Sequence, residues 1–363
     1  MFFWRNFMKK FLKKIPMILL AVFIMTFFFS VFFMMGVFGW HTMKLNDEET
    51  VIRNAGYWNK KDIGDYSLNT HITGNRLSNK KIVGISGLGI DNYPVGMSFV
   101  NDELQSDYLL VYIDRAGYGA SDDNKIPQTV ENIVEDYRQA LNELKIAPPY
   151  VLMPHSLGSV YATYWAMTYP DEIEAIIYID GTTINEAAIS NQVINVKIEE
   201  TIVELGQLGF YRLALDNYID ELPGNYSEDD KMASNALYAR NVASMAKLSE
   251  IVERDNNIRK TIDVIRQTDT PKLYISSHAA FTTHEEVKQY FDWEYNKAVK
   301  VNYTDERADK LISQCEEIRN DNILPFIESI GNAELINLPG DHCIYLEKPI
   351  ELANIIQEFL SGL

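Results

Sequence analysis

The stretch that decides the fold is Tyr150-Val-Leu-Met-Pro-His-Ser-Leu-Gly-Ser159. Its apolar start, Tyr150 to Met153, predicts a buried strand, and the apolar spacing after Gly158 predicts a helix. A serine on the tight turn between such a strand and helix has the geometry of a nucleophile elbow, which exposes the hydroxyl at the top of the sheet. The N-terminus of the helix offers N–H groups and a partial positive charge to a developing oxyanion. Ser156 is therefore the candidate nucleophile.

The alternative interpretation of this stretch is an ordinary turn, because serine two residues before glycine is common after a strand. Pro154 also stands where a small residue usually lets the strand and the helix approach closely. Proline does hold the preceding residue extended, as a strand end requires. The rest of the chain has to decide between the two interpretations.

Length and composition restrict the class of protein. A chain of 363 residues suits one large domain with an insertion, or two domains, and 47% hydrophobic residues are ample for a core. The 33 basic and 51 acidic residues give a net charge of −18, which argues against binding nucleic acid. The two cysteines, Cys315 and Cys343, allow one disulfide but exclude a disulfide framework and a cysteine-based metal site, and we expect two free or buried thiols.

The N-terminal segment predicts a membrane anchor. Residues 1–14 are basic and contain no acid, and residues 15–40 are apolar without a charge. About 20 such residues span a bilayer as a helix. The run is longer than the core of a signal peptide, lacks an A-x-A cleavage site, and has no polar face that would suit a core helix. The positive-inside rule places residues 1–14 in the cytoplasm. We expect an uncleaved, single-pass signal anchor in the cell membrane with an extracytoplasmic domain; a long cleaved signal peptide is the alternative.

The body of the chain alternates strands with helices. After a linker at residues 41–65 the sequence predicts strands at residues 66–72, 81–86, 107–114, 150–153, 175–180, 271–276 and 333–338. This alternation predicts an α/β fold with a mainly parallel sheet and helices on both faces. Reactive groups in such sheets gather beyond the carboxyl ends of the strands. Ser156, Asp180 and the turn at Gly87 are expected there.

His342 is the candidate general base. It follows the last predicted strand and the turn Pro339-Gly340-Asp341, so it can reach over the sheet to a serine. An imidazole can take up and return a proton near neutral pH. The alternative is a surface or capping histidine. The other five histidines are weaker candidates, and because no pair has metal-ligand spacing on an evident helix face, we expect no metal. They are His41, His71, His155, His278 and His284.

Four ordered motifs carry a family resemblance. Gly87-Leu88-Gly89, Asp114-Arg-Ala-Gly-Tyr-Gly-Ala-Ser121, His155-Ser156-Leu157-Gly158 and Gly340-Asp341-His342 resemble the α/β-hydrolase superfamily over residues 66–363. The resemblance implies Ser156 as nucleophile, His342 as general base, and an oxyanion hole from the N–H groups of Leu88 and Leu157. Ser86 stands where the family usually has a histidine.

The resemblance also bears on the triad acid and on a cap. The loop after residues 271–276 has no carboxylate at the family's usual distance. Some members place the acid one strand earlier, where Asp180 stands; a helix cap or a loop residue is the alternative role for it. The further candidates for the triad acid are Glu285, Glu286 and Asp321. Residues 181–269 have a helical pattern and match the place of a helical cap, between core segments 66–180 and 270–363.

The first functional interpretation is a membrane-anchored serine hydrolase that cleaves an ester through an acyl-enzyme without a cofactor. Within hydrolases, an aminopeptidase resembling proline iminopeptidases is the runner-up, and it needs an acidic pair for the substrate amine. Haloalkane dehalogenation is disfavoured because that chemistry uses an aspartate where Ser156 stands. A non-catalytic sensor module on the same fold is the alternative from another class. We expect a small ester or a short peptide as substrate and no nucleic acid partner; the sequence leaves substrate identity and oligomeric state open.

Overall fold

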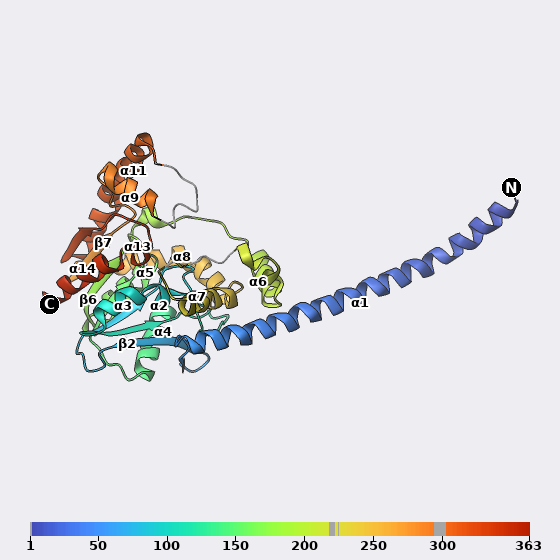
Figure 1. The fold of residues 1–363 in the computed structure, drawn as a ribbon, viewed down its shortest axis with the longest axis horizontal. Coiled ribbons are helices and arrows are strands. Elements are labelled where there is room, and N and C mark those ends of the chain that lie inside the picture. Colours follow the sequence, from blue (N-terminus) through green and yellow to red (C-terminus); the bar gives the residue numbers. More distant parts are fainter. Residues whose placement is uncertain (1, 218–221, 224, 294–302) are drawn as a thin grey trace.

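The structure, a computed structural model, describes residues 2–217, 222, 223, 225–293 and 303–363. Within these ranges the side chains of residues 2, 3, 5–13 and 215–217 are outside the description. The centre of the fold is one eight-stranded sheet (Figure 1). Its strands are β1 (Lys60–Asp62), β2 (Ser67–Gly74), β3 (Lys81–Ile85), β4 (Leu109–Ile113), β5 (Tyr150–Pro154), β6 (Ile173–Ile179), β7 (Lys272–Ser276) and β8 (Ala333–Asn337).

The strand order across the sheet is β1-β2-β4-β3-β5-β6-β7-β8. The pairs from β4 to β8 are all parallel, and β1 and β2 pair antiparallel at one edge. The central strands β4 and β5 are buried along their whole length, as strands covered on both faces must be. The predicted α/β fold with a mainly parallel sheet is therefore confirmed.

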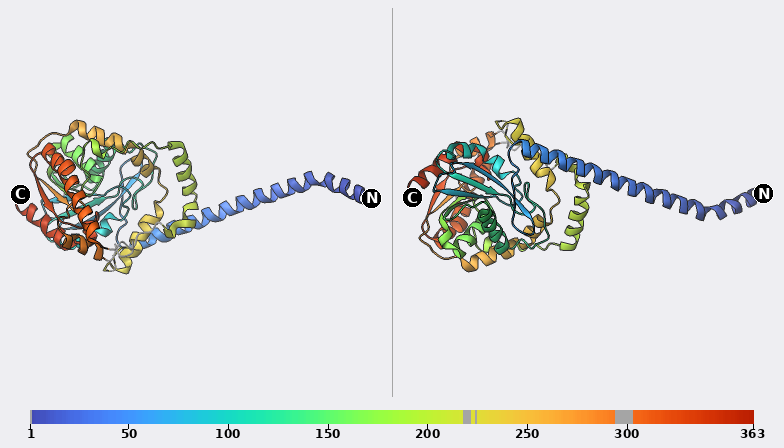
Figure 2. Two further views of the ribbon diagram at one scale, coloured as in Figure 1. Left: turned by 90° about the horizontal axis from the view of Figure 1, so that it is seen from above. Right: turned by 90° about the horizontal axis from the view of Figure 1, so that it is seen from below.

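Helices cover both faces of the sheet (Figures 1 and 2). Side chains from α4, α5, α8 and α12 pack on one face, and those from α3 and α14 pack on the other. The helical elements are α1 (Phe2–Asn54), α2 (Tyr93–Gly96), α3 (Ser98–Leu104), α4 (Val130–Glu143), α5 (Gly158–Thr168), η1 (Pro170–Glu172), η2 (Glu186–Ala188), α6 (Val196–Gln207), η3 (Phe210–Asn217), α7 (Glu228–Arg240), α8 (Met245–Val264), α9 (His284–Asp292), α11 (Asp305–Ile318), η4 (Arg319–Ile323), α12 (Leu324–Ile330), α13 (Ile344–Glu347) and α14 (Pro349–Ser361).

Helix α1 projects from this body as a single rod of 53 residues (Figure 1). Its segment from Lys14 onward is long and apolar enough to cross a membrane, with a mean hydropathy of 2.7 in its most apolar part and none of that part buried. The basic side chains of Arg5, Lys9, Lys10 and Lys13 lie outside the described side chains.

The end of α1 belongs to the globular body. Residues 41–65, for which the sequence predicts a linker, contain the last turns of α1 and strand β1. Val37, His41, Glu48 and Ile52 are buried and share one side of the helix, which packs against α7. The rod and the body therefore meet at a packed contact rather than at a flexible joint.

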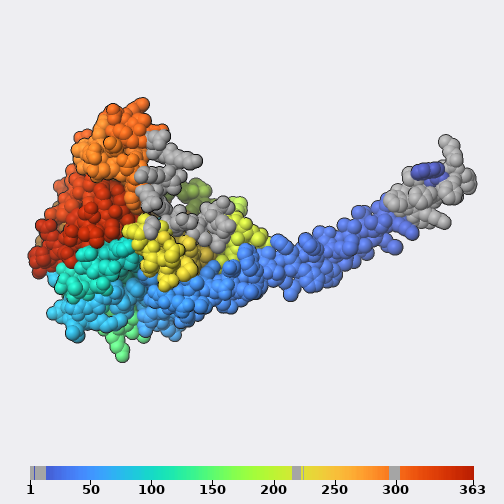
Figure 3. Space-filling view, viewed as in Figure 1, coloured from blue at the N-terminus to red at the C-terminus, as the bar shows by residue number. Residues whose placement is uncertain are grey.

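Between β6 and β7 the described residues form the helical elements η2, α6, η3, α7 and α8. Helices α7 and α8 lie on the body, and α6 lies beyond them next to α1 (Figures 1 and 2). The space-filling view shows the α6 region and α7 bordering the C-terminal part of α1 (Figure 3).

Candidate active site

Ser156 lies on a sharp turn between β5 and α5. Its φ of 52° is left-handed, which is uncommon for a residue other than glycine and is a strained conformation. Gly158 opens α5, and a Cβ there would lie 2.5 Å from the Ile85 carbonyl oxygen of β3. Helix and strand therefore approach closely at Gly158, and the turn has the strand–turn–helix shape of a nucleophile elbow despite Pro154.

Two backbone N–H groups near Ser156 are candidates for an oxyanion hole. Among the residues that the structure describes, no hydrogen bond from the N–H of Leu88 or of Leu157 is found. Leu157 follows Ser156 at the start of α5, and Leu88 lies on the loop after β3. A Cβ on Gly87 would lie 2.8 Å from Ser156 Cβ, so this loop passes directly beside the serine. Both N–H groups are thus available to a negatively charged oxygen.

Buried Arg115 fixes the loop that carries Leu88. Its guanidinium donates to the carbonyl oxygens of Ser86 at 2.7 Å and of Gly87 at 2.9 Å. Glu250 of α8 forms an ion pair with Arg115 at 3.1 Å and accepts a hydrogen bond from Tyr161 at 2.6 Å. This role of Arg115 was not predicted from the sequence, although Arg115 lies in one of the four motifs. The signal was a basic residue directly after a buried strand.

Asp180 and His342 meet at the carboxyl ends of β6 and β8. His342 Nδ1 lies 2.6 Å from Asp180 Oδ2, and the carboxylate is buried. Asp180 Oδ1 accepts from the backbone N–H of Ser277 at 2.7 Å. Burial alone would raise the pKa of Asp180, but hydrogen bonds from His278 and His342 outweigh it and hold that pKa well below its usual value. The carboxylate is therefore ionised at neutral pH and orients one imidazole edge.

His278 is a second imidazole on the same oxygen. Its Nδ1 lies 2.5 Å from Asp180 Oδ2, and half of its side chain is exposed. His278 lies on the loop after β7, which has no carboxylate at the position where the family usually has its triad acid. Burial would lower its pKa, but the hydrogen bond and charge of Asp180 outweigh this and raise it. No local pattern in the sequence predicts this contact, because β6 and β7 are neighbours only in the folded sheet.

His155 supports the loop that carries His342. It is fully buried, its Nε2 lies 3.0 Å from the His342 carbonyl oxygen, and the two ring centroids are 4.6 Å apart. Burial, with a smaller effect from His342, lowers the pKa of His155 to about 3, so the ring is neutral and donates its Nε2 proton. The prediction that His155 does not act as the base stays a prediction.

The serine and the base are near each other without a direct bond. Within the described residues no hydrogen bond joins Ser156 Oγ to His342. A Cβ on Gly87 would lie 2.8 Å from Ser156 Cβ and 3.1 Å from His155 Nδ1, and the His155 ring packs against the His342 ring. Catalytic hydrogen bonds are often long before substrate binds and shorten in the complex.

Comparison with known proteins identifies the family. The family model described as the alpha/beta hydrolase fold matches residues 84–349. The chain belongs to the α/β-hydrolase family.

The relatives of this hydrolase are distant. Uncharacterized protein YbdG of Bacillus subtilis is 23% identical over 335 residues, 89% of this chain and 91% of that protein. Serine hydrolase-like protein 2 of Homo sapiens is 22% identical over 268 residues, 71% of this chain and 80% of that protein. Among solved structures, an enol-lactonase from Burkholderia xenovorans superposes with a TM-score of 0.54 at 17% identity, over 84% of this chain and 100% of that chain. These structures share the fold.

The further candidates for the triad acid of this hydrolase have other surroundings. Glu286 belongs to a capping box at the start of α9, where it accepts hydrogen bonds from the N–H groups of Thr282 and Thr283. Glu285 and Asp321 are exposed. In the described part of the chain only Asp180 has a hydrogen bond to His342 among these carboxylates.

One group of side chains has the donor set of a zinc site. Asp180, His278 and His342 each present one ligand atom, and these atoms lie within 4.8 Å of one another. Both Nδ1 atoms, however, lie at hydrogen-bond distance from the same carboxylate oxygen. An Nδ1 that donates its proton to a carboxylate cannot bind a metal ion, so this geometry fits a hydrogen-bonded cluster.

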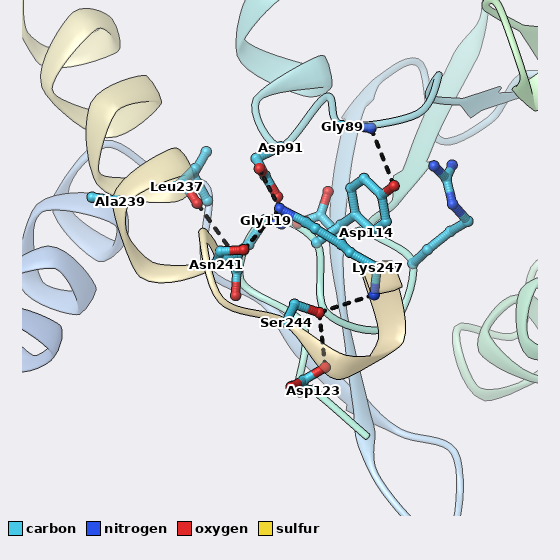
Figure 4. Close-up of polar contacts among 12 residues, drawn as sticks. Gly89, Asp91, Asp114, Gly119, Asp123, Leu237, Ala239, Asn241, Ser244 and Lys247 are labelled. Carbon is cyan, nitrogen blue, oxygen red and sulfur yellow. Dashed lines mark hydrogen bonds and ion pairs between the residues drawn. The ribbon is translucent and has the colours of Figure 1, made fainter. Parts of the chain in front are cut away.

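The segment between β6 and β7 docks on the glycine-rich loop 115–121 (Figure 4). Lys247 Nζ lies 2.6 Å from Asp91 Oδ2, whose other oxygen accepts from the Gly119 N–H at 3.0 Å. Asn241 donates to the Gly119 carbonyl oxygen, and Ser244 Oγ donates to Asp123 at 2.8 Å. These contacts fix the start of α8 beside the loop 115–121, which begins with Arg115.

A cavity of about 530 Å³ lies beside Leu88. Its other walls come from the segment before α6 and from α8, and they combine apolar with charged side chains. They are Ser190, Asn191, Gln192, Ile194, Ile251, Val252, Arg254, Asp255 and Arg259. The candidate oxyanion loop thus borders a space large enough for a small ligand.

Proposed function

We propose that this α/β hydrolase is a membrane-anchored serine esterase that works through Ser156, His342 and Asp180. The observation that carries the proposal is the 2.6 Å hydrogen bond between His342 Nδ1 and Asp180 Oδ2, next to the left-handed turn at Ser156. A serine hydroxyl is a weak nucleophile until a base removes its proton. The pairing of His342 with a buried carboxylate is what such a base requires.

The proposed reaction has two halves. Ser156 Oγ attacks the ester carbonyl carbon while His342 Nε2 takes the hydroxyl proton, and His342 then gives that proton to the departing alkoxide. Water, deprotonated by His342, next attacks the acyl-enzyme and releases the acid and Ser156. Asp180 holds the Nδ1 proton and stabilises the imidazolium in both halves.

The oxyanion of each tetrahedral intermediate is assigned to the N–H groups of Leu88 and Leu157. Their lack of other partners among the described residues supports this role. One such donor is worth about 10²–10³ in kcat in enzymes of this kind. Arg115 contributes as a positioning residue, because it holds the carbonyl oxygens of Ser86 and Gly87. The Gly87 carbonyl and the Leu88 N–H belong to the same planar peptide unit, so this contact fixes the orientation of the N–H.

Anchoring by α1 is the second part of the proposal. Its support is the exposed apolar stretch that ends where the helix meets the globular body, and the basic residues before that stretch. We expect the full-length chain to stay in the membrane after alkaline carbonate extraction, with intact mass retained and the C-terminal body outside the cytoplasm. A protein found in the medium with residues 1–40 removed would contradict the anchor.

Hydrolysis of p-nitrophenyl esters tests the esterase. The full-length protein in detergent is compared with Ser156→Ala, His342→Ala and Asp180→Asn, with Ser159→Ala, in the first turn of α5, as a matched control. We expect kcat to fall by about 10³-fold or more in the first three variants. The control should keep full activity, because buried Ser159 has no hydrogen-bond partner among the described residues. A folded wild type that hydrolyses none of a series of short and medium-chain esters would contradict the proposal.

A further inference from the structure

Helix α6 has three distinct faces. One face packs on the body, since a Cβ on Gly206 would lie 2.5 Å from Ala243 Cβ. A second face is polar and carries Lys197, Glu200 and Glu204. The third is apolar and exposed: Ile198, Ile202 and Leu205 are 54%, 56% and 50% exposed, and their spacing of four and then three residues puts them in one stripe.

Apolar residues on both sides of α6 in the chain are exposed as well. Val193, before the helix, is 96% exposed, and Leu213, after it, is 59% exposed. Scattered apolar residues on a surface need no explanation, but a contiguous patch on an amphipathic helix marks a contact with an apolar partner. The question is which partner lies against it.

The position of α6 points to the partner. The helix runs across the direction of α1, at the end of the globular body that faces the apolar half of α1, in all three views (Figures 1 and 2). A helix placed crosswise to a membrane-spanning helix lies along the plane of the membrane. The geometry is that of a helix resting on the surface of the bilayer that α1 crosses.

Contacts between η3 and α1 fix this position. The guanidinium of Arg212 in η3 forms a bidentate ion pair with the Glu48 carboxylate at 2.6 and 2.9 Å. Its Nε donates to His41 Nδ1 at 2.7 Å. The rings of Phe210 and Phe33 have centroids 6.4 Å apart. Phe33 belongs to the charge-free stretch of residues 15–40, so the segment that follows α6 already touches the apolar part of α1.

The level along α1 at which Phe210 meets Phe33 agrees with the boundary of a bilayer. A hydrocarbon core of about 30 Å takes roughly 20 helical residues, which from Ile15 reaches the neighbourhood of Phe33. The level at which Phe210 meets α1 is therefore the outer edge of the hydrocarbon. Acidic residues on α6 and the net charge of −18 argue against attraction to anionic lipids, so the contact depends on apolar burial.

We propose that the stripe Ile198, Ile202 and Leu205 of α6 lies in the outer boundary of the lipid bilayer that α1 spans. The inference rests on the anchoring of α1 in the proposed function. This contact would be the second one with the membrane, besides α1. It would place α6 against the outer leaflet. The contact persists at high salt, because it is apolar.

The test places an environment-sensitive nitrobenzoxadiazole label at single positions of the full-length chain. Cys343→Ser removes the partly exposed thiol, and Cys315 is buried. Labels at Ile202→Cys and at the matched control Glu200→Cys compare the apolar and polar faces of α6, and Phe27→Cys reports on α1. The protein is reconstituted in phosphatidylcholine vesicles with and without doxyl-labelled lipid.

We expect emission at positions 27 and 202 to shift to shorter wavelength and to be quenched by doxyl lipid, at low and at high salt alike. Emission at position 200 should stay water-like. Equal, water-like emission at 200 and 202 with quenching at 27 would overturn the α6 contact and leave the anchor intact. Water-like emission at 27 would overturn the anchor and the α6 contact together.

Discussion

At the scale of single residues, the site is organised around one oxygen atom. Asp180 Oδ2 has His342 Nδ1 at 2.6 Å and His278 Nδ1 at 2.5 Å, while Oδ1 is held by backbone N–H groups. A buried carboxylate needs such donors, because burial without them costs several kcal/mol. In the proposed mechanism His342 shuttles the proton and His278 helps to keep Asp180 ionised.

The first prediction concerns His278 and pH. The pKa of His278 is raised above the ordinary value of 6.5 by Asp180, so its ion pair stabilises the fold fully below pH 6.5 and is lost as pH rises through the raised pKa. Half-exposed groups contribute little, and we expect on the order of 1 kcal/mol. Urea unfolding at pH 5.5 and at pH 9 should show His278→Gln destabilised at the lower pH only. His284→Gln, at an exposed histidine of α9, is the control; an equal loss for His278→Gln at both pH values would contradict the assignment.

At the scale of elements, the oxyanion loop, the loop 115–121 and α8 form one unit. Arg115 connects the carbonyl oxygens of Ser86 and Gly87 to Glu250 of α8. The Tyr118 hydroxyl adds a further contact, because it accepts a hydrogen bond from the Gly89 N–H at 3.1 Å. The geometry of the candidate oxyanion hole therefore depends on a helix that lies far along the chain.

The second prediction tests this unit. Removing Arg115 alone would leave Glu250 as a buried, unpaired charge and cost about 3–5 kcal/mol of stability. The double variant Arg115→Met/Glu250→Gln avoids that charge. We expect it to fold and to lower kcat about 10²-fold with KM little changed, because the Leu88 N–H loses its position. Urea unfolding of the double variant beside the wild type checks that both proteins are folded under the assay conditions. A double variant with wild-type kcat would contradict the positioning role.

The sequence predicted those elements whose pattern is local. The parallel strands, the turn at Ser156 and the place of His342 follow from apolar runs and turn residues, and the structure has them where they were expected. The contact of His278 with Asp180 depends on β6 and β7 becoming neighbours across 98 residues. The end of α1 resembles a linker in sequence, because its buried stripe, which includes His41, Glu48 and Ile52, contains polar residues.

At the scale of the whole molecule, α1 and the hydrolase body are joined rigidly. Ile52 of α1 is completely buried in a cluster that includes side chains of α7, and Glu48 is paired with Arg212. Under the proposed anchoring of α1, a body fixed to this helix presents a defined face to the bilayer. The proposed contact between the apolar stripe of α6 and the membrane depends on this rigid connection.

The third prediction is that Ile52→Ala destabilises the body. Removing a fully buried isoleucine side chain costs about 2–5 kcal/mol, whereas the exposed neighbour Thr50→Ala should cost less than about 0.5 kcal/mol. Urea unfolding of the full-length protein in detergent, followed by tryptophan fluorescence, measures both. If the two variants unfold at the same urea concentration as the wild type, α1 beyond His41 is a separate linker after all.

Labelling by a fluorophosphonate, followed by intact mass and peptide mapping, shows directly whether Ser156 is the nucleophile. We expect one label per chain, on Ser156, with labelling abolished in Ser156→Ala, slowed about 10³-fold or more in His342→Ala, and unchanged in Ser159→Ala. A folded wild-type protein that takes up no label, or a label that persists in Ser156→Ala, would contradict the assignment of Ser156 as the nucleophile.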